Sequence, residues 1–363
     1  MIYLDYQATT PLAPEARDAM LRWLDGPGGT GFGNPHSPHK MGRQAKAAIE
    51  FARDQVAALF PGGGRVIFTS GATEAINLAI RGSGTGGTVS VSAIEHAAVL
   101  DTARDAGTCH VLNVAKNGQC NTKQDLPQDT RLVCLMQVNN EIGTIQPTVE
   151  WHRKAKENNA LYFCDAVQAY GKIEVTGADM IAISAHKFHG PKGVGALWVR
   201  NGVELAEVQT GGGQEFGLRS GTLSPALIAG MGAAAAEAKK RMEQDAEHVQ
   251  KLWQRAAQIF EDWELNGSAE ARYHGNLNIR PRGPNGGGLD VNRLMSECRN
   301  VMFSAGSACA SGSGRTSHVL EAIGLSQKKA KASIRLGWGR YTTMDEIETA
   351  AARINAAAKE QGV

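Results

Sequence analysis

Apolar runs and amphipathic stretches alternate along the chain from about residue 38 to residue 200. The runs are short and nearly all apolar, which is typical of strands that are covered on both faces of a sheet. They lie at residues 65–69, 88–92, 110–114, 131–138, 161–165, 180–184 and 194–199. Helical patterns separate several of them, at residues 72–80, 95–106 and 148–159. This alternation predicts an α/β domain with a mostly parallel sheet of seven strands.

A long helical pattern begins at Pro225 and continues to about residue 263. It is long enough to connect two domains. The elements after it are fewer and more mixed, and they end in a helix that is predicted to start near Met344. We therefore expect a large α/β domain over residues 14–250, and a smaller α+β domain formed by residues 1–13 and 251–363.

The composition is that of an ordinary globular protein, with 42% hydrophobic and 20% charged residues among 363. A net charge of +2 does not indicate the strongly basic surface that binds nucleic acid or a membrane. The first residues, "MIYLDYQATTPLAPEA", lack the basic start and the apolar run of a signal peptide. No apolar stretch approaches the roughly 20 residues of a membrane span. We therefore expect a cytoplasmic protein.

Six cysteines are present, and no two of them form a Cys-x-x-Cys pair. In a cytosolic chain they are expected to stay reduced, and a structural zinc site is not expected. Cys134 and Cys164 lie inside apolar runs and are predicted to be small buried hydrophobes. Cys309 differs, because glycine and serine dominate its neighbourhood, "FSAGSACASGSGRTSH". That composition predicts a mobile loop, where a thiol suits a nucleophile better than a core residue.

Polar residues follow the strand that is predicted to end at Thr69. Ser70, Gly71 and Thr73 lie at its junction with a helix, in "FTSGATEAINLAI". A helix N-terminus offers unpaired N–H groups and the positive end of a dipole, and both suit a phosphate. An ordinary helix cap is the alternative interpretation of these residues. The pattern does not match a Walker loop.

Two later strands also end in polar residues. Asp165 closes the run 161–165, and Gln168 lies three residues on. Ligands of open α/β sheets bind beyond the carboxyl ends of the strands, and a carboxylate there needs a cationic or hydrogen-bonding partner. A helix cap is again the alternative. The strand that ends at Ser184 is followed by His186 and Lys187.

A phosphate site, an acid and a lysine on one rim are what pyridoxal 5′-phosphate (PLP) requires. The lysine amine bonds to the aldehyde of the cofactor. The acid keeps the pyridine nitrogen protonated, so that the ring can accept electrons. A helix N-terminus and hydroxyl groups hold the phosphate.

Nine motifs in order then resemble the cysteine desulfurases, in the class V aminotransferase branch of the fold-type I PLP enzymes. The resemblance covers nearly the whole chain. The motifs are "YLDYQATTP", "GNPHSPH", "FTSGATEAINLAI", "IEHAAVL", "VNNEIGTIQP", "DAVQAYGK", "SAHKFHGPKGVGALWV", "GGGQEFGLRSGT" and "GSACASGS". The resemblance implies the PLP-dependent transferase fold, with a large sheet domain and a small α+β domain that carries the Cys309 segment.

The resemblance also implies roles for particular residues. Lys187 would carry the cofactor and move protons, and His96 would stack on the PLP ring and assist proton transfer. Asp165 would pair with the pyridinium nitrogen, and Gln168 would donate to the phenolic oxygen of the ring. The other implied cofactor contacts are Ala72, Thr73, Asn140, Ser184, His186 and, from a neighbouring subunit, Thr222.

The substrate implied by the resemblance is L-cysteine. Asn140 and Arg335 would bind its carboxylate, for which a planar guanidinium group is suited, and Arg340 is the competing arginine. The Cys309 thiolate would take the substrate sulfur as a persulfide and leave L-alanine. The role of Thr222 in trans implies a homodimer with shared active sites.

The partner implied by the resemblance is a sulfur acceptor or an iron–sulfur scaffold protein. The long segment of small residues around Cys309 resembles the type I subgroup, whose members deliver sulfur in this way. Iron–sulfur cluster assembly is the favoured destination; nitrogenase maturation and thiolated tRNA synthesis stay open. The chain stops at "AAAKEQGV", without the C-terminal tail by which some relatives dock a scaffold. No resident metal is implied, and Cys309 would contact a cluster only in transit.

Three other functions compete with this interpretation. A selenocysteine lyase or another class V aminotransferase would use the same cofactor site, although a transaminase needs no nucleophile at Cys309. A metal-dependent hydrolase would use the His-x-x-His pairs that begin at His36 and His186, but these lack helical i, i+4 spacing and a carboxylate cluster. A sulfur carrier without catalysis would not explain the phosphate, acid and lysine set.

Overall fold

A computed structural model of the chain describes residues 1–306 and 316–363. Its largest sheet has seven strands. β8 runs antiparallel to both of its neighbours, β2 and β7, and all the other strand pairs are parallel. In sheet order the strands are β2 (Gly64–Thr69), β8 (Gly195–Arg200), β7 (Met180–Ser184), β6 (Leu161–Asp165), β5 (Thr130–Cys134), β3 (Thr88–Ser92) and β4 (Thr108–Leu112). The predicted mostly parallel sheet of seven strands is confirmed.

The run predicted as a strand over 131–138 is longer than the strand that forms. β5 ends at Cys134, although the N–H groups of Leu135 and Gln137 still donate to the carbonyls of Phe163 and Asp165 in the next strand. Met136 and Val138 instead line a cavity beyond the sheet. The apolar residues of this run therefore belong partly to the sheet core and partly to the cavity wall. The hydrophobic pattern alone does not distinguish the two.

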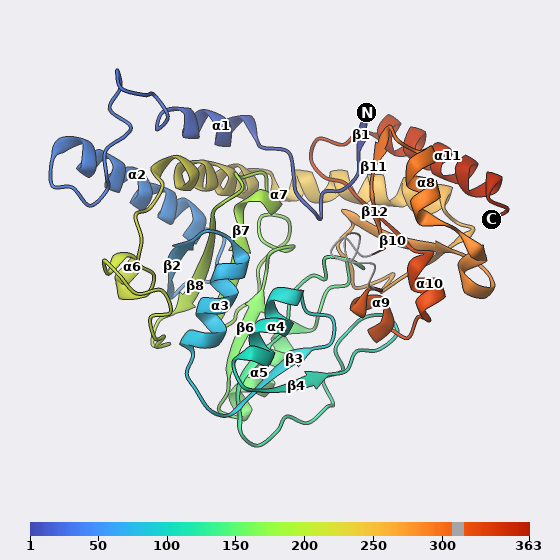
Figure 1. The fold of residues 1–363 in the computed structure, drawn as a ribbon, viewed down its shortest axis with the longest axis horizontal. Coiled ribbons are helices and arrows are strands. Elements are labelled where there is room, and N and C mark those ends of the chain that lie inside the picture. Colours follow the sequence, from blue (N-terminus) through green and yellow to red (C-terminus); the bar gives the residue numbers. More distant parts are fainter. Residues whose placement is uncertain (307–315) are drawn as a thin grey trace.

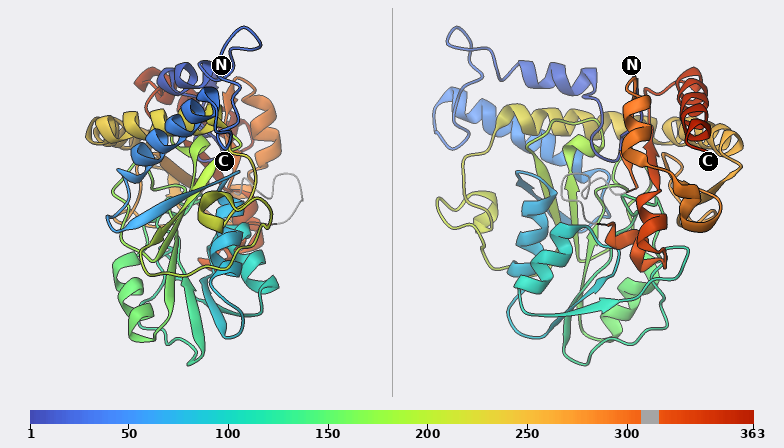
Figure 2. Two further views of the ribbon diagram at one scale, coloured as in Figure 1. Left: turned by 90° about the vertical axis from the view of Figure 1, so that its left-hand side faces the viewer. Right: turned by 45° about the vertical axis from the view of Figure 1, so that its right-hand side comes forward.

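Helices cover both faces of the large sheet, as Figures 1 and 2 show. One apolar core lies between the sheet and two helices, α3 (Ala72–Gly82) and α4 (Ala97–Asp105). The core on the opposite face includes residues of α2 (Lys40–Ala57), α5 (Thr148–Glu157) and α7 (Pro225–Ile259). The predicted burial of Cys134 and Cys164 is confirmed, since neither side chain is exposed. The large sheet is thus the middle of three layers.

The remaining helices and turns of the large unit are short. α1 (Pro14–Leu21) packs along α7, and η1 (Ala185–Lys187) directly follows β7. α6 (Gln214–Gly217) contains two non-glycine residues with positive φ, Glu215 and Phe216, and so is a tight turn of the chain. It lies beside β2 at the edge of the large sheet (Figure 1).

The C-terminal part forms a second, smaller sheet with its own helices, on the right of Figure 1. It contains β12 (Ser304–Ala305), β13 (Ile334–Gly337), β10 (Asn276–Pro281) and β9 (Trp263–Leu265), all antiparallel to their neighbours. The N-terminal strand joins this part, because β1 (Ile2–Tyr3) pairs with β11 (Val301–Met302). Its helices are η2 (Pro284–Gly288), α8 (Val291–Glu297), α9 (His318–Ala322), α10 (Gln327–Lys331) and α11 (Met344–Glu360).

The long helix α7 connects the two parts. Ser224 caps its first turn by accepting the N–H of Leu227, and Pro225 occupies the first helical position, where no N–H is needed. The helix continues without interruption to Ile259, so the predicted boundary at residue 250 falls inside it. The division into 14–250, 1–13 and 251–363 stays a prediction. Within the described ranges, no helix is both long and apolar enough to cross a membrane.

Candidate active site

A cavity of about 700 Å³ opens at the carboxyl ends of the parallel strands of the large sheet. Its volume is typical of a small-molecule site, and its place is where open α/β sheets bind ligands. The predicted site residues that line it are Ala72, Thr73, His96, Asn140, Asp165, Gln168, Ser184, His186, Lys187 and Arg335. Of the predicted site residues that the structure describes, the fold therefore brings together all except Thr222.

One end of the cavity is rich in hydrogen-bond donors. Helix α3 begins there, and its first N–H groups have no partner within the helix. The hydroxyl of Ser184 lies close to Gly71, 3.9 Å from where a Cβ atom on that glycine would stand. Burial, followed by the charge of Lys187, lowers the pKa of His186 to about 4, so its ring is neutral near pH 7. This end suits an anion with several oxygens.

The carboxylate of Glu74 also lines this end of the cavity. It is paired with Arg219, whose Nε lies 2.6 Å from Oε1, and it accepts the N–H of Ser70 at 2.7 Å. Although burial acts in the other direction, these bonds lower the pKa of Glu74. Its negative charge is therefore balanced within the protein and does not oppose an anion at α3.

Asp165 and His96 lie in another part of the cavity wall. The Asp165 carboxylate accepts the N–H of Val167 at 2.9 Å, and burial raises its pKa although His96 and Lys187 act in the other direction. The Nδ1 atom of His96 accepts the N–H of Ala98 at 3.1 Å, which leaves the ring proton on Nε2. Burial lowers the pKa of His96, so the ring is neutral. His96 caps α4 and also lines the cavity.

Lys187 reaches the cavity from η1 and contacts the N-terminal loop. Its Nζ donates to the carbonyl oxygens of Gln7 and Ala8, the latter at 2.9 Å. The side-chain amide of Gln168 donates to the same Gln7 carbonyl at 3.0 Å. A Cβ atom on Gly337 would lie 1.6 Å from Oε1 of Gln7, so only glycine lets β13 pass this close to the loop.

Gln7, Ala8 and Thr9 line the cavity, and sequence reasoning assigned them no role. The signal was present, since all three lie in the motif "YLDYQATTP". These residues neither follow a predicted strand nor begin a predicted helix. They belong to an N-terminal loop that reaches the site from a distant part of the chain.

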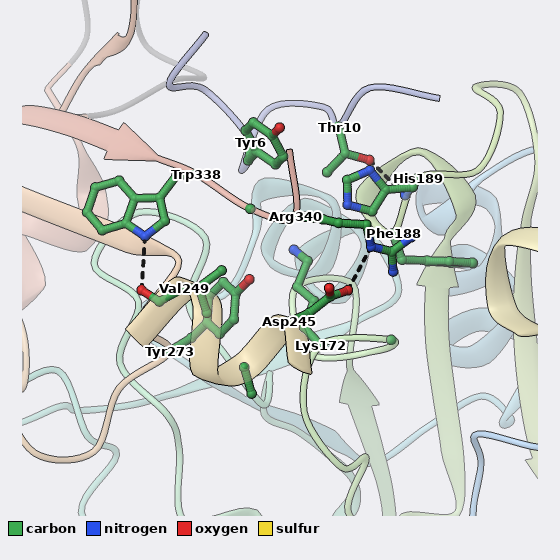
Figure 3. Close-up of a pocket in the computed structure, with 13 residues that line it drawn as sticks. Tyr6, Thr10, Lys172, Phe188, His189, Asp245, Val249, Tyr273, Trp338 and Arg340 are labelled. Carbon is green, nitrogen blue, oxygen red and sulfur yellow. Dashed lines mark hydrogen bonds and ion pairs between the residues drawn. The ribbon is translucent and has the colours of Figure 1, made fainter. Parts of the chain in front are cut away.

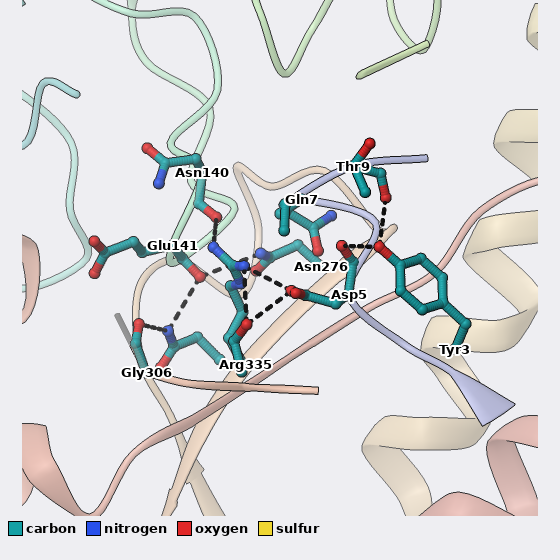
Figure 4. Close-up of polar contacts among 12 residues, drawn as sticks. Tyr3, Asp5, Gln7, Thr9, Asn140, Glu141, Asn276, Gly306 and Arg335 are labelled. Carbon is teal, nitrogen blue, oxygen red and sulfur yellow. Dashed lines mark hydrogen bonds and ion pairs between the residues drawn. The ribbon is translucent and has the colours of Figure 1, made fainter. Parts of the chain in front are cut away.

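Arg335 enters the cavity from β13 of the small sheet, and Figure 4 shows its contacts. Nη2 lies 2.8 Å from Asp5 Oδ1, and Nη1 donates to the carbonyl of Asn140 at 3.0 Å. The residue is only 1% exposed, and its Nε is buried without a partner among the described residues. The competing Arg340 pairs with Asp245 at 2.7 Å and lines a different, small cavity. The geometry favours Arg335 for binding a carboxylate.

One predicted residue, Thr222, is not brought to the cavity, and another, Cys309, is not among the described residues. Thr222 is exposed and lies three residues before α7. Cys309 lies outside the described residues, but the chain on either side of its segment is placed. The carbonyl of Gly306 accepts from Asn278 at 3.0 Å, and the Ser317 hydroxyl donates to the Glu141 carboxylate. Both flanks are thereby tied to the loop after β5, because Asn278 also donates to the Glu141 carbonyl.

The two His-x-x-His pairs are not gathered around a common centre. His39 caps α2 by accepting the N–H of Gly42, and His189 contacts the carbonyl of Pro11 at 2.9 Å. Among the residues that the structure describes, no group of three or more His, Cys, Asp or Glu side chains is arranged to hold a metal ion.

The side chains of the cavity fit PLP. The donor-rich start of α3 matches the phosphate, and Lys187 matches the aldehyde. Asp165 offers a buried carboxylate with acceptor sites beyond the one used by Val167, which suits a protonated ring nitrogen. The unpaired Nε of Arg335 provides a donor for the carboxylate of an amino acid.

Comparisons with known proteins agree with this chemistry. Residues 2–349 match the aminotransferase class-V family. A cysteine desulfurase IscS from Colwellia psychrerythraea is 40% identical, over 96% of this chain and 90% of that protein. A mitosomal cysteine desulfurase from Trachipleistophora hominis is also 40% identical, over 99% of this chain and 86% of that protein.

Solved structures give the same result. A NifS-like protein has a TM-score of 0.88 and 30% identity, over 99% of both chains. A structure described as SspA in complex with cysteine has a TM-score of 0.81 and 33% identity, over 94% of this chain and all of that one. The chain belongs to the class-V aminotransferase family, within its PLP-dependent cysteine desulfurases.

Proposed function

We propose that this protein removes sulfur from L-cysteine, leaving L-alanine and a persulfide on Cys309. One observation carries the proposal: Lys187, Asp165 and the buried Arg335 converge on a single cavity that has a helix N-terminus at one end. The neighbour described as a complex with cysteine supports the choice of substrate.

PLP, when bound, supplies an aldehyde that joins an amino group and a ring that stores an electron pair. The protein residues do the rest. Arg335 binds the substrate carboxylate and orients the amino acid, and its bonds to Asp5 and Asn140 fix the guanidinium plane. Asp165 holds a proton on the ring nitrogen. Lys187 moves protons to and from the α-carbon.

The neutral ring of His96 is a second candidate for proton transfer, since its Nε2 carries a proton and its Nδ1 is occupied by a backbone N–H. The Cys309 thiolate attacks the substrate sulfur. The new S–S bond forms as the Cβ–S bond breaks, and the carbon fragment keeps the electron pair, takes up a proton and leaves as alanine.

We also propose a homodimer, with Thr222 reaching the cofactor phosphate of the partner. The exposure of Thr222 outside the cavity of its own chain supports this arrangement. The proposed partner is a protein that accepts the persulfide sulfur, and the proposed pathway is iron–sulfur cluster assembly. The proposed location is the cytoplasm. Relatives named as mitosomal and mitochondrial enzymes show that the location varies among similar proteins.

The test is an assay of alanine and sulfide after the purified protein is incubated with L-cysteine and PLP. Cys309→Ala is expected to keep the yellow cofactor and to lose sulfide release, because only the acceptor of sulfur is removed. Lys187→Ala is expected to lose both the cofactor absorbance band and alanine formation.

Cys109→Ala is the matched control, since Cys109 is a partly exposed thiol on β4, outside the cavity. Its activity should equal that of the wild type. Full desulfurase activity in Cys309→Ala would overturn the assignment of the nucleophile. The same assay with L-selenocysteine tests the selenocysteine lyase alternative, which requires a clear preference for that substrate.

A further inference from the structure

Lys172 lies just behind the cofactor cavity, in the loop that follows β6. Its ammonium donates to Oε1 of Gln168 at 3.1 Å. It lines a separate cavity of about 30 Å³, shown in Figure 3, which has room for about one or two water molecules. The proposed function uses Gln168 but gives Lys172 no part.

The bond from Lys172 determines which way the Gln168 amide points. The oxygen and nitrogen of a glutamine amide are nearly alike in shape, so their orientation is set by hydrogen bonds. An ammonium group only donates. While Lys172 is protonated, the amide oxygen therefore faces Lys172 and the amide nitrogen faces the other way.

On its other side, the amide nitrogen of Gln168 donates to the carbonyl of Gln7 at 3.0 Å. The same carbonyl accepts from the ammonium of Lys187. A chain of hydrogen bonds therefore runs from Lys172 through Gln168 and Gln7 to Lys187. The amide nitrogen has two N–H groups, and the bond to Gln7 uses one of them. Gln168 itself lines the cofactor cavity.

The charge of Lys172 is costly where it lies. Burial, followed by repulsion from Lys187, lowers its pKa to about 7. The folded protein then binds this proton less well than the unfolded chain, so Lys172 destabilises the fold at every pH below the ordinary pKa of lysine. The other charged groups around the same cavity are Asp245 and Arg340, which pair with each other at 2.7 Å. The ammonium also lies 5.4 Å from the centre of the Tyr273 ring, a contact that offsets part of this cost.

We propose that Lys172 is a positioning residue, which holds the Gln168 amide so that an N–H group and not the oxygen is presented to the cofactor. This inference rests on the proposed function, because it assumes that PLP occupies the larger cavity. Without Lys172 only the bond to the Gln7 carbonyl orients the amide, so the flipped orientation becomes more populated. In that orientation the oxygen of Gln168 opposes the Gln7 carbonyl and any oxygen of a bound cofactor.

The test is a double-mutant cycle of Lys172→Met, Gln168→Leu and the double variant. Methionine keeps the length of the side chain and removes its donors. The measurements are the dissociation constant of PLP, the pH titration of the bound cofactor's visible absorbance, and the melting temperature of the cofactor-free protein. Lys172→Met should weaken PLP binding roughly 2- to 10-fold, as expected for one lost hydrogen bond, and should shift the titration. In the Gln168→Leu background it should add no further effect.

The melting temperature separates a positioning role from a structural one. The cofactor-free Lys172→Met protein should melt at the same temperature as the wild type or higher, because a costly charge is removed. Lys154→Met is the control, since Lys154 donates to the carbonyls of Thr122 and Gln124, away from both cavities; it should leave both cofactor measurements unchanged.

Additive effects in the cycle, or an unshifted titration in Lys172→Met, would overturn the role of Lys172. A wild-type protein that neither binds PLP nor forms alanine from cysteine would instead overturn the proposed function, so the two failures are distinguishable.

Discussion

Asp165 illustrates, at the scale of single residues, how a site keeps a charge that the fold disfavours. Burial raises the pKa of its carboxyl group, and the neighbouring His96 and Lys187 offset only part of that effect. Asp179 shows the opposite effect: despite burial, the N–H of Tyr162 and the neighbouring His152 ring, 3.6 Å away, lower the pKa of its carboxyl group. One aspartate costs stability near pH 7, and the other contributes to it.

Replacing each aspartate by asparagine should therefore change stability in opposite directions. Without cofactor, Asp165→Asn is expected to melt about 1–3 °C above the wild type near pH 7, and Asp179→Asn below it. Asp165 is protonated in both states below its unfolded pKa, so the advantage of Asp165→Asn should vanish there. It should grow as the pH rises from the unfolded pKa towards the raised folded pKa, and level off above it. The advantage of the wild type over Asp179→Asn should also be lost as the pH falls.

The measurement is calorimetry of both variants between about pH 4 and pH 8. The Asp165→Asn protein should in addition form little alanine with PLP present, because an amide cannot hold the proton on the ring nitrogen. A lower melting temperature for Asp165→Asn at neutral pH would contradict the cost assigned to this carboxylate.

The turn at α6 illustrates, at the scale of elements, how a strained segment is held in place. Glu215 has a φ of 48°, a conformation that costs energy in a non-glycine residue. Its carboxylate accepts two hydrogen bonds from Arg53, at 2.7 and 2.8 Å, and a third from the N–H of Phe68 at 2.6 Å. The Glu215 side chain is 2% exposed and that of Arg53 11%. This buried pair ties the segment that leads to Thr222 onto β2.

Removing the carboxylate should be among the most damaging single changes in the large unit. Glu215→Ala leaves Arg53 buried without its main partner, and breaking such a pair typically costs about 3–5 kcal/mol. Denaturant unfolding would measure this loss. The control is Asp18→Ala, which breaks the exposed pair with Arg17 and should change stability by less than about 1 kcal/mol. Equal effects of the two changes would contradict the importance given to burial.

The sequence predicted those features that depend on near neighbours in the chain. Strand ends at Asp165 and Ser184 follow from short apolar runs, and the start of α3 follows from its junction with β2. The pairing of Glu215 with Arg53, 162 positions apart in sequence, does not follow from any local pattern. The contact of Lys172 with Gln168 could not be predicted either, because a lysine four residues after a glutamine is common in sequences and indicates no contact.

At the scale of the whole molecule, the candidate site depends on both sheets and on both ends of the chain. The large sheet supplies Asp165, Lys187 and the start of α3, and the small sheet supplies Arg335. The N-terminal loop lies between them, since Asp5 pairs with Arg335 while Gln7 accepts from Lys187. Any movement of the small sheet relative to the large one would therefore move the carboxylate-binding arginine relative to the lysine.

The proposed sharing of sites between two subunits gives a further prediction at this scale. If Thr222 completes the phosphate site of the partner, Thr222→Asp should place a negative charge beside that phosphate and weaken cofactor binding and activity. Lys187→Ala should inactivate its own chain. In a hybrid dimer of the two variants, the site that keeps Lys187 receives an intact Thr222 from the other chain, and is complete.

Refolding the two variants together should thus give more activity than either variant has alone. In an equal mixture with random pairing, half of the dimers are hybrids and each has one complete site, so about a quarter of the wild-type activity is expected. Size-exclusion chromatography with light scattering would establish the dimer in parallel. A dimer whose mixed variants regain no activity would show that Thr222 acts within its own chain or not at all, because complementation requires that it act across the interface.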